Sequence, residues 1–311
     1  MTTRHSVFFG DVAEDEYYVT PHFPVAGDKV IVQALPPQFG GSVANAASIY
    51  AHYGMPTSFI SQLNSGTLTQ RLLRQMREQG IATDHVIFDE DVPDSKCIVL
   101  LHGEQHIVLI PTLGITHSEI TPAAFEHMAT AEFVVSTLTD VKPFRMAGRG
   151  PADILDRLRR RGARIVLDLD VYNAENQGSG LLEHCDILFM NSLGASRFEQ
   201  EGQAIARLID GGALAIVVTR DAEGCELHTA SGMVTVPGIP VDVVDVTGAG
   251  DTFTSSFLYA YSSTGDLVEA AEFANAAASL AVGRVGARGG LTTRDAVEAF
   301  RRSNTRTASS A

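Results

Sequence analysis

The chain has few basic residues and lacks any long apolar run. Of its 311 residues, 23 are Lys or Arg and 37 are Asp or Glu, so the formal net charge is -14. This charge opposes general affinity for nucleic acid or for an anionic membrane. No window is apolar enough to span a bilayer, and the apolar run near the N-terminus is too short for a signal peptide. We therefore expect a soluble cytoplasmic protein that binds neither nucleic acid nor membrane.

Cysteine is equally scarce. Cys97, Cys185 and Cys225 lie far apart in the sequence, and no pair has the close spacing of a metal-binding or redox motif. This spacing favours reduced structural thiols.

Short apolar runs rich in β-branched and aromatic residues alternate with segments of helical length. Such runs include "VFFGDV", "RIVLDLD" and "LAIVVTR". The alternation predicts an α/β fold with three layers, in which helices flank a mainly parallel sheet. Residues 16–34 and 94–111 break the alternation and predict a small β-sheet lid inserted in two segments. The main domain then comprises residues 1–15, 35–93 and 112–303, and the polar residues 304–311 form a disordered tail.

The stretch "DVTGAGDTF", residues 245–253, joins a strand-like run to an amphipathic helix that starts near Gly248 to Gly250. The first amides of a helix have no intrahelical acceptor, and glycines leave them uncovered, so this loop can hold an anion such as a phosphate. Asp251 follows in the first turn, where it could take a proton from an attacking hydroxyl. An ordinary capped helix after a glycine-rich turn explains the loop equally well. The pattern is neither a P-loop nor a dinucleotide fingerprint.

Several motifs in order resemble the ribokinase-like (PfkB-type) family of carbohydrate and nucleoside kinases. "DVTGAGDTF" is similar to the family's C-terminal signature, with Val246 where Thr is usual. "FGGSVANAASIYAHYG" resembles its glycine-rich N-terminal motif, "GDVAED" its opening strand, and "FANAAASLAVGRVGARGG" the segment beside the nucleotide base. The likeness extends over nearly the whole chain and implies a ribokinase-like fold.

The resemblance also implies roles for individual residues. Asp251 matches the general base, and the amides of Gly248, Ala249 and Gly250 match the anion hole. The residues implied to hold substrate hydroxyls are Asp15, Gly41 and Asn45, together with Asp251. Those implied on the nucleotide side are Asn191, Thr219, Gly224, Thr247, Gly248, Gly250 and Asn275, with the turn at Gly286.

ATP and Mg²⁺ are the implied cosubstrate and cofactor, and a monovalent cation such as K⁺ near the loop is a further expectation. The family's Asn-x-x-Glu motif, which organises magnesium, is represented by Asn191, but Gly194 stands where the acid is usual. Asp221 likewise replaces a glycine near the phosphates. Asn191 is thus the only metal ligand that the resemblance supplies.

The predicted activity is transfer of the γ-phosphoryl group of ATP to a hydroxyl of an unphosphorylated sugar or sugar-like compound, because the neighbourhood of Asp15 is acidic. A nucleoside is an alternative acceptor, since Tyr17, Tyr18 or Phe23 could stack on a base. A sugar- or nucleotide-binding protein that has lost catalysis is another alternative, which Gly194 supports. A redox enzyme is a third, although the first strand lacks the glycine motif it needs. The apolar lid strands predict a homodimer formed through the lid.

Overall fold

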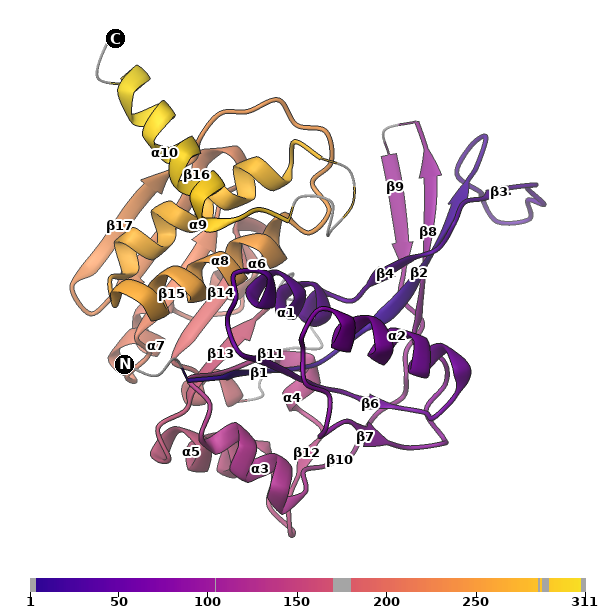
Figure 1. Cartoon of the computed structure of the whole chain (residues 1–311), viewed down its shortest axis with the longest axis horizontal. Coiled ribbons are helices and arrows are strands. Elements are labelled where there is room, and N and C mark those ends of the chain that lie inside the picture. The colour runs from indigo at the N-terminus through magenta and orange to yellow at the C-terminus, as the bar shows by residue number, and fades with distance from the viewer. Residues whose placement is uncertain (1–3, 104, 170–179, 285, 287–290, 309–311) are drawn as a thin grey trace.

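The protein is described by a computed structural model that covers residues 4–103, 105–169, 180–284, 286 and 291–308 (Figure 1). None of the helices in these residues is both long and apolar enough to cross a membrane.

An eight-stranded sheet forms the centre of the main domain. Across the sheet its strands are β17 (Gly232–Pro237), β16 (Gly224–Thr229), β15 (Ala215–Thr219), β14 (Ile187–Asn191), β13 (Arg164–Asp168), β11 (Phe133–Thr137), β1 (Ser6–Phe9) and β5 (Thr57–Ile60). The six strands from β15 to β5 are parallel, and β16 and β17 are antiparallel additions. The predicted mainly parallel sheet is confirmed.

Helices cover both faces of this sheet, as alternate residues of its strands require. Phe8 packs with one set of helices, whereas Val7 and Phe9 on the same strand pack with the other. The first set is α1 (Ser42–His52), α2 (Thr67–Glu78), α8 (Ala249–Thr264), α9 (Leu267–Ala281) and α10 (Arg294–Ala308). The second set is α3 (Pro122–Ala129), α4 (Leu138–Val141), α5 (Pro151–Arg160), α6 (Ser192–Gln200) and α7 (Ile205–Asp210). The predicted three layers are therefore present.

A separate small sheet projects beside the main one (Figure 1). It consists of β3 (Gln33–Ala34), β2 (Ala13–Val19), β8 (Lys96–His102) and β9 (Gln105–Leu109), with β4 (Gln38–Gly40) also paired to β2. Two further short pairs join β6 (Gln62–Leu63) to β7 (Ile87–Phe88) and β10 (Ser118–Glu119) to β12 (Phe144–Arg145). The small sheet reaches beyond the predicted lid segments, because β2 begins at Ala13 in order to pair with β4.

The C-terminal segment differs from its prediction. Helix α10 continues to Ala308, whereas the sequence predicted a disordered tail from residue 304. Asn304 Nδ2 donates to Phe300 O one helical turn earlier, so this polar side chain folds back onto the helix. Residues 309–311 lie outside the described residues.

Candidate active site

The glycine loop leads into α8 as the sequence predicts. Gly248 is the N-cap residue, with a φ of +75° that favours glycine. Ala249 N donates to Val246 O at 3.1 Å, so this amide is used within the loop. Among the described residues, no group accepts a hydrogen bond from Gly248 N or Gly250 N. Two of the three predicted anion-hole amides thus remain available to a ligand.

Asp245, which the sequence analysis did not assign to the site, holds this loop in place. Its Oδ1 accepts from Thr247 N at 2.9 Å and from Thr247 Oγ1 at 2.6 Å, and its Oδ2 accepts from Gly286 N at 2.8 Å. Burial raises the pKa of Asp245, but the hydrogen bonds from Thr247 and Gly286 outweigh it and keep the carboxyl below its usual pKa. Thr247 therefore shapes the loop through its hydroxyl. Residues 287–290, in the segment assigned to the nucleotide base, lie outside the described residues.

Asp251 lies in the first turn of α8 and receives two hydrogen bonds from α1. Ser42 Oγ donates to its Oδ1 at 2.6 Å, and Asn45 Nδ2 donates to its Oδ2 at 3.1 Å. Burial raises the pKa of Asp251 to about 7; the bonds from Ser42 and Asn45 lower it, and the carboxylates of Asp168 and Asp11 raise it. A carboxyl with such a pKa is suited to accept a proton near neutral pH.

The start of α1 is what brings Ser42 and Asn45 to this carboxyl. Gly41 is the N-cap residue, with a φ of +94°, and a Cβ at this position would lie 2.7 Å from Val12 Cα. Asp11 accepts from the Ser42 and Val43 amides at 3.1 and 3.0 Å, which satisfies the first donors of the helix. The sequence did not lead us to predict Ser42 as a site residue, although its position next to Gly41 was a signal for it.

Asp15 lies on β2 in the small sheet, opposite Gln38 on β4 and Cys97 on β8. A Cβ on Gly40 would meet its carboxyl at 2.1 Å, so a larger residue there would displace the Asp15 side chain. Burial raises the pKa of Cys97 to about 12, and the nearby Asp15 carboxylate contributes. Asp15 is thus half-buried beside the residues that precede α1.

Further carboxylates, not assigned from the sequence, surround the same end of the sheet. Asp168 ends β13, and its Oδ2 accepts from Thr254 Oγ1 of α8 at 3.0 Å. Burial, with Asp11 as the next cause, raises the pKa of Asp140 to about 7. Thr137 Oγ1 donates to Asp140 Oδ2 at 2.6 Å. This end of the sheet is strongly acidic.

The residues assigned to the nucleotide side lie at neighbouring strand ends. Asn191 and Thr219 are paired across β14 and β15, and Gly224 is paired with Pro237 across β16 and β17. A Cβ on Gly224 would lie 2.1 Å from Val236 O, so only glycine permits this close approach. Thr219 Oγ1 donates to Met190 O at 3.5 Å. These residues thus lie at the same end of the sheet, and α8 begins near that end.

Asn275 on α9 makes contacts that are structural. Its Nδ2 donates to Val236 O at 3.1 Å and to Pro237 O at 3.2 Å, so the buried amide ties α9 to the end of β17. A nucleotide base could accept a hydrogen bond from Asn275 Nδ2 only if Nδ2 released Val236 O or Pro237 O.

The described residues do not fit a magnesium site supplied by the protein. Asn191 Oδ1 accepts from Gly194 N at 2.7 Å as the cap of α6, so its oxygen is already engaged. Gly194 supplies no carboxylate. Within the described part of the chain, no group of three or more His, Cys, Asp or Glu side chains could hold a metal ion.

Known proteins are similar to this chain over almost its entire length. A family model described as pfkB family carbohydrate kinase matches residues 3–294. The ribokinase of Bacillus subtilis is 26% identical over 304 residues, covering 95% of this chain and 98% of that protein. An ATP-dependent ribose-1-phosphate kinase of Halopiger xanaduensis is 25% identical over 292 residues, covering 94% and 96%. The structure of Arabidopsis thaliana ribokinase complexed with ribose and ATP aligns with a TM-score of 0.79 at 25% identity, covering 97% and 99% of the two chains. The chain therefore belongs to the pfkB family of carbohydrate kinases and is a phosphotransferase that acts on a sugar hydroxyl.

Proposed function

We propose that this kinase transfers the γ-phosphoryl group of ATP to a hydroxyl of an unphosphorylated sugar or sugar-like compound, with Asp251 as the base. The observation that carries the proposal is the position of Asp251. Asp251 is the third residue of α8, at whose start the amides of Gly248 and Gly250 are available, and burial raises its pKa to about 7. A proton acceptor and an anion site thus meet at one helix start.

In the proposed reaction, Asp251 accepts the proton of the attacking sugar hydroxyl. The hydroxyl oxygen then bonds to the γ-phosphorus of ATP, while the bond between the γ-phosphorus and the bridging oxygen of the β-phosphate breaks and ADP leaves. The hydrogen bonds from Ser42 and Asn45 keep the carboxylate oriented. The amides of Gly248 and Gly250 face the charge that develops on the transferred group. Mg²⁺ would arrive with the phosphates of ATP. A monovalent cation such as K⁺ near the loop stays a prediction.

Charge supports an unphosphorylated acceptor. Asp11, Asp15 and Asp140 lie near the start of α1, where their charge would repel a phosphate, and the half-buried Asp15 would accept hydrogen bonds from hydroxyls. The two relatives compared above act on ribose in one case and on a phosphorylated ribose in the other, so homology does not decide the acceptor.

A nucleoside is the alternative acceptor. Burial raises the pKa of Tyr17, on β2 of the small sheet, to about 12, and the carboxylates of Asp15 and of Asp245 in the glycine loop contribute. This position would let Tyr17 stack on a base. Phe23 instead packs edge-on against His102 at 5.7 Å between ring centroids.

An activity screen tests the proposal. ATP consumption is measured with pentoses, hexoses, phosphorylated sugars and nucleosides, and the product is identified by mass spectrometry. We expect ADP formation above the background of Asp251→Asn with at least one unphosphorylated sugar. Ligand binding without ADP formation would instead favour a binding protein that has lost catalysis, for which the absence of an acid at Gly194 is the supporting observation. Turnover only with phosphorylated sugars would contradict the acceptor assignment.

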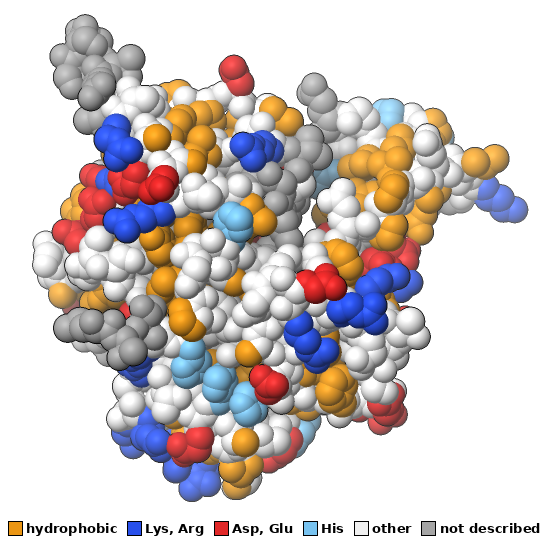
Figure 2. Space-filling model, viewed as in Figure 1, with side chains coloured by type: hydrophobic (Ala, Val, Ile, Leu, Met, Phe, Trp, Pro, Cys, Tyr) orange, Lys and Arg blue, Asp and Glu red, His pale blue; other side chains and the backbone are white. Residues whose placement is uncertain are grey.

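We further propose a homodimer formed through the small sheet. Ile98 pairs with Leu109 and Leu100 with Ile107, so these four apolar side chains share one face of the sheet. Leu109 is 48% exposed and Ile107 39% exposed in the single chain. Hydrophobic side chains gather on this part of the surface (Figure 2). Light scattering at micromolar concentration should give twice the mass of one chain, and Leu109→Glu should reduce it to a monomer.

A further inference from the structure

Three consecutive hydroxyl residues lie buried in α8, directly after its first turn. Thr254 is 3% exposed, and Ser255 and Ser256 are fully buried. A hydroxyl inside a helix often bonds to the carbonyl oxygen one turn earlier, as Ser263 Oγ does with Tyr259 O in the same helix. The three hydroxyls at 254–256 instead bond to groups outside α8.

Two of these hydroxyls join α8 to α1. Ser255 Oγ donates to Ala46 O at 2.7 Å, and Ser256 Oγ lies 2.8 Å from Tyr53 OH. Burial raises the pKa of Tyr53 to about 12, so both partners are neutral near pH 7. These two bonds therefore fix the helix in place without adding charge.

Thr254 differs from them, because it reaches a carboxylate of the central sheet. Its Oγ1 donates to Asp168 Oδ2 at 3.0 Å, and Asp168 is the last residue of β13. Residues three apart on a helix lie on the same face, with about 5 to 6 Å between their Cβ atoms. Thr254 thus brings Asp168 to the face of α8 that carries Asp251.

The groups that act on Asp251 come from three parts of the chain. Burial raises its pKa most, and the hydrogen bonds from Ser42 and Asn45 of α1 lower it. The carboxylate of Asp168 at the end of β13 raises it, and that of Asp11, which follows β1, does so to a smaller extent. Asp168 is therefore the stronger of the two charges that oppose ionisation of Asp251.

A carboxylate at position 168 carries an electrostatic cost. Asp251 acts as a base only when it is ionised, and two neighbouring negative charges repel each other. An asparagine would accept the same hydrogen bond from Thr254 without this repulsion. The hydrogen bond alone thus does not explain why the residue is an aspartate.

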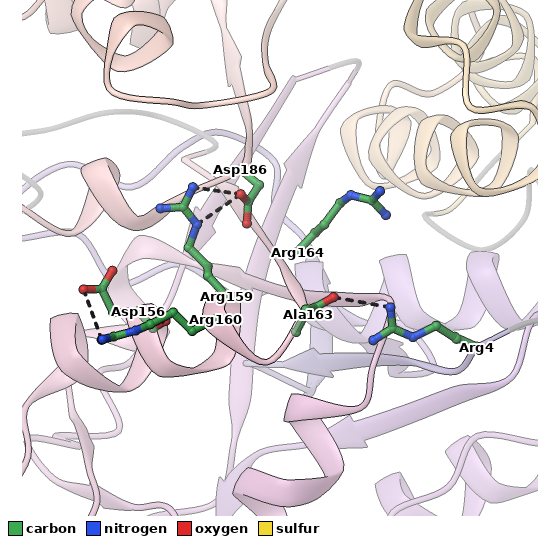
Figure 3. Close-up of a pocket in the computed structure, with 8 residues that line it drawn as sticks. Arg4, Asp156, Arg159, Arg160, Ala163, Arg164 and Asp186 are labelled. Atoms are coloured by element: carbon green, nitrogen blue, oxygen red, sulfur yellow. Dashed lines mark hydrogen bonds and ion pairs between the residues drawn. The ribbon is translucent and has the colours of Figure 1, made fainter.

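Another aspartate beside the sheet has a purely structural role. Asp186 precedes β14, at the opposite end of the sheet from Asp168, and its Oδ1 accepts from Arg159 Nε at 3.0 Å and from Arg159 Nη2 at 2.9 Å (Figure 3). Its Oδ2 accepts from Ile165 N at 2.7 Å. Asp186 therefore ties α5 to β13 while the charge of Arg159 balances its own.

We propose that Asp168 is a positioning residue for phosphoryl transfer: it fixes the start of α8 through Thr254, and its negative charge makes Asp251 a stronger base. This role rests on the proposed function of Asp251 as the base. The proton of the attacking hydroxyl moves to Asp251, whereas Asp168 takes no proton and stays ionised. Proton transfer then leaves one negative charge where there were two, so the repulsion is relieved as the reaction proceeds.

The pH dependence of kcat/KM separates the charge of Asp168 from its hydrogen bond. Asp168→Asn keeps an acceptor for Thr254 but removes the charge, so the rising limb should move to lower pH by about half a unit or more. Thr254→Val keeps the charge and removes the bond. Its limb should stay at the wild-type pH, while kcat falls about tenfold because Asp251 is less well placed.

Asp186→Asn is the matched control, because it removes a structural carboxylate of the same sheet. Its unfolding midpoint should fall, and its limb should stay in place. Asp168→Ser, a second neutral acceptor, should move the limb as Asp168→Asn does and replaces it if that variant does not fold. A limb that stays in place in these neutral variants, in an enzyme that needs Asp251, would overturn this inference alone. Full activity of Asp251→Asn would instead reject the proposed base, and with it this role of Asp168.

Discussion

Ser42 Oγ donates a hydrogen bond of 2.6 Å to Asp251 Oδ1, and this bond joins the first turns of two helices that lie 209 residues apart in the sequence. The bond stabilises the ionised form of a carboxyl whose pKa burial raises to about 7. The protonation state of the proposed base therefore depends on α1 as well as on its own helix.

The pH profile of the reaction tests this dependence. Because the base acts when ionised, kcat/KM should rise with pH through a pKa near 7 in the wild type. Ser42→Ala removes a bond that lowers this pKa, so the rising limb should move to higher pH. Ser48→Ala is the matched control, since Ser48 Oγ donates to Ala44 O on the same helix and does not contact Asp251. A profile that is identical in all three proteins would contradict the assigned role of Ser42.

Asp251→Asn should retain ATP binding while turnover falls about a hundredfold or more, because a positioned proton acceptor is lost. Nucleotide titration and steady-state kinetics measure the two effects separately. Asp153→Asn, which changes an exposed acid in the first turn of α5, should keep wild-type turnover. Full activity of the Asp251 variant would exclude it as the base.

Gly194→Glu introduces the acid that the family resemblance predicts at this position. We expect this variant to reach half-maximal activity at a lower magnesium concentration, because a carboxylate near Asn191 can bind the ion directly. Gly194→Gln has a similar size without the charge and should behave like the wild type. An unchanged magnesium dependence in Gly194→Glu would show that other groups provide the metal contacts.

Gly41→Ala should reduce the free energy of unfolding by about 3 kcal/mol or more, because φ is +94° and the new Cβ would lie within 2.8 Å of Val12 Cα and Asp11 O. Gly80 provides the control, since its φ is +80° but a Cβ there meets nothing within 4 Å. Gly80→Ala should cost only about 1 to 2 kcal/mol. Denaturant titration gives both values, and equal losses would show that close packing at Gly41 is unimportant.

His127, which lies in a cluster of three histidines, should make stability depend on pH. His127 stacks on His5 at 4.3 Å between ring centroids and lies 4.7 Å from His85. Burial, followed by His5 and His85, lowers the pKa of His127 to about 4. Between pH 6.5 and 4 the unfolded chain therefore binds more protons at this residue than the folded chain does. The free energy of unfolding should fall as the pH falls through this range.

Replacement of that histidine isolates its contribution. His127→Gln should flatten the pH dependence of the unfolding midpoint between pH 6.5 and 4, whereas His117→Gln, at an exposed site, should leave it unchanged. The prediction fails if the slope of the His127 variant equals that of the wild type.

Much of the site could be predicted from the sequence because its parts are local. The glycine loop, Asp251 and the start of α1 each lie within a few consecutive residues, so their conformations follow from nearby chain geometry. Ser42, Asp245 and Asp140 were not identified, because their roles depend on contacts with residues distant in sequence or on burial. Asn275 was assigned to the nucleotide side, whereas its donors engage the backbone of β17.

The sequence by itself determined the alternation of strands and helices, the separate small sheet and the position of Asp251, the proposed base, in the first turn of a helix that follows a glycine loop, because periodicity and glycine placement act over short distances. Only the tertiary structure decided which side chains hold Asp251 and how far its pKa rises. Those properties arise from burial and from charges that folding brings together.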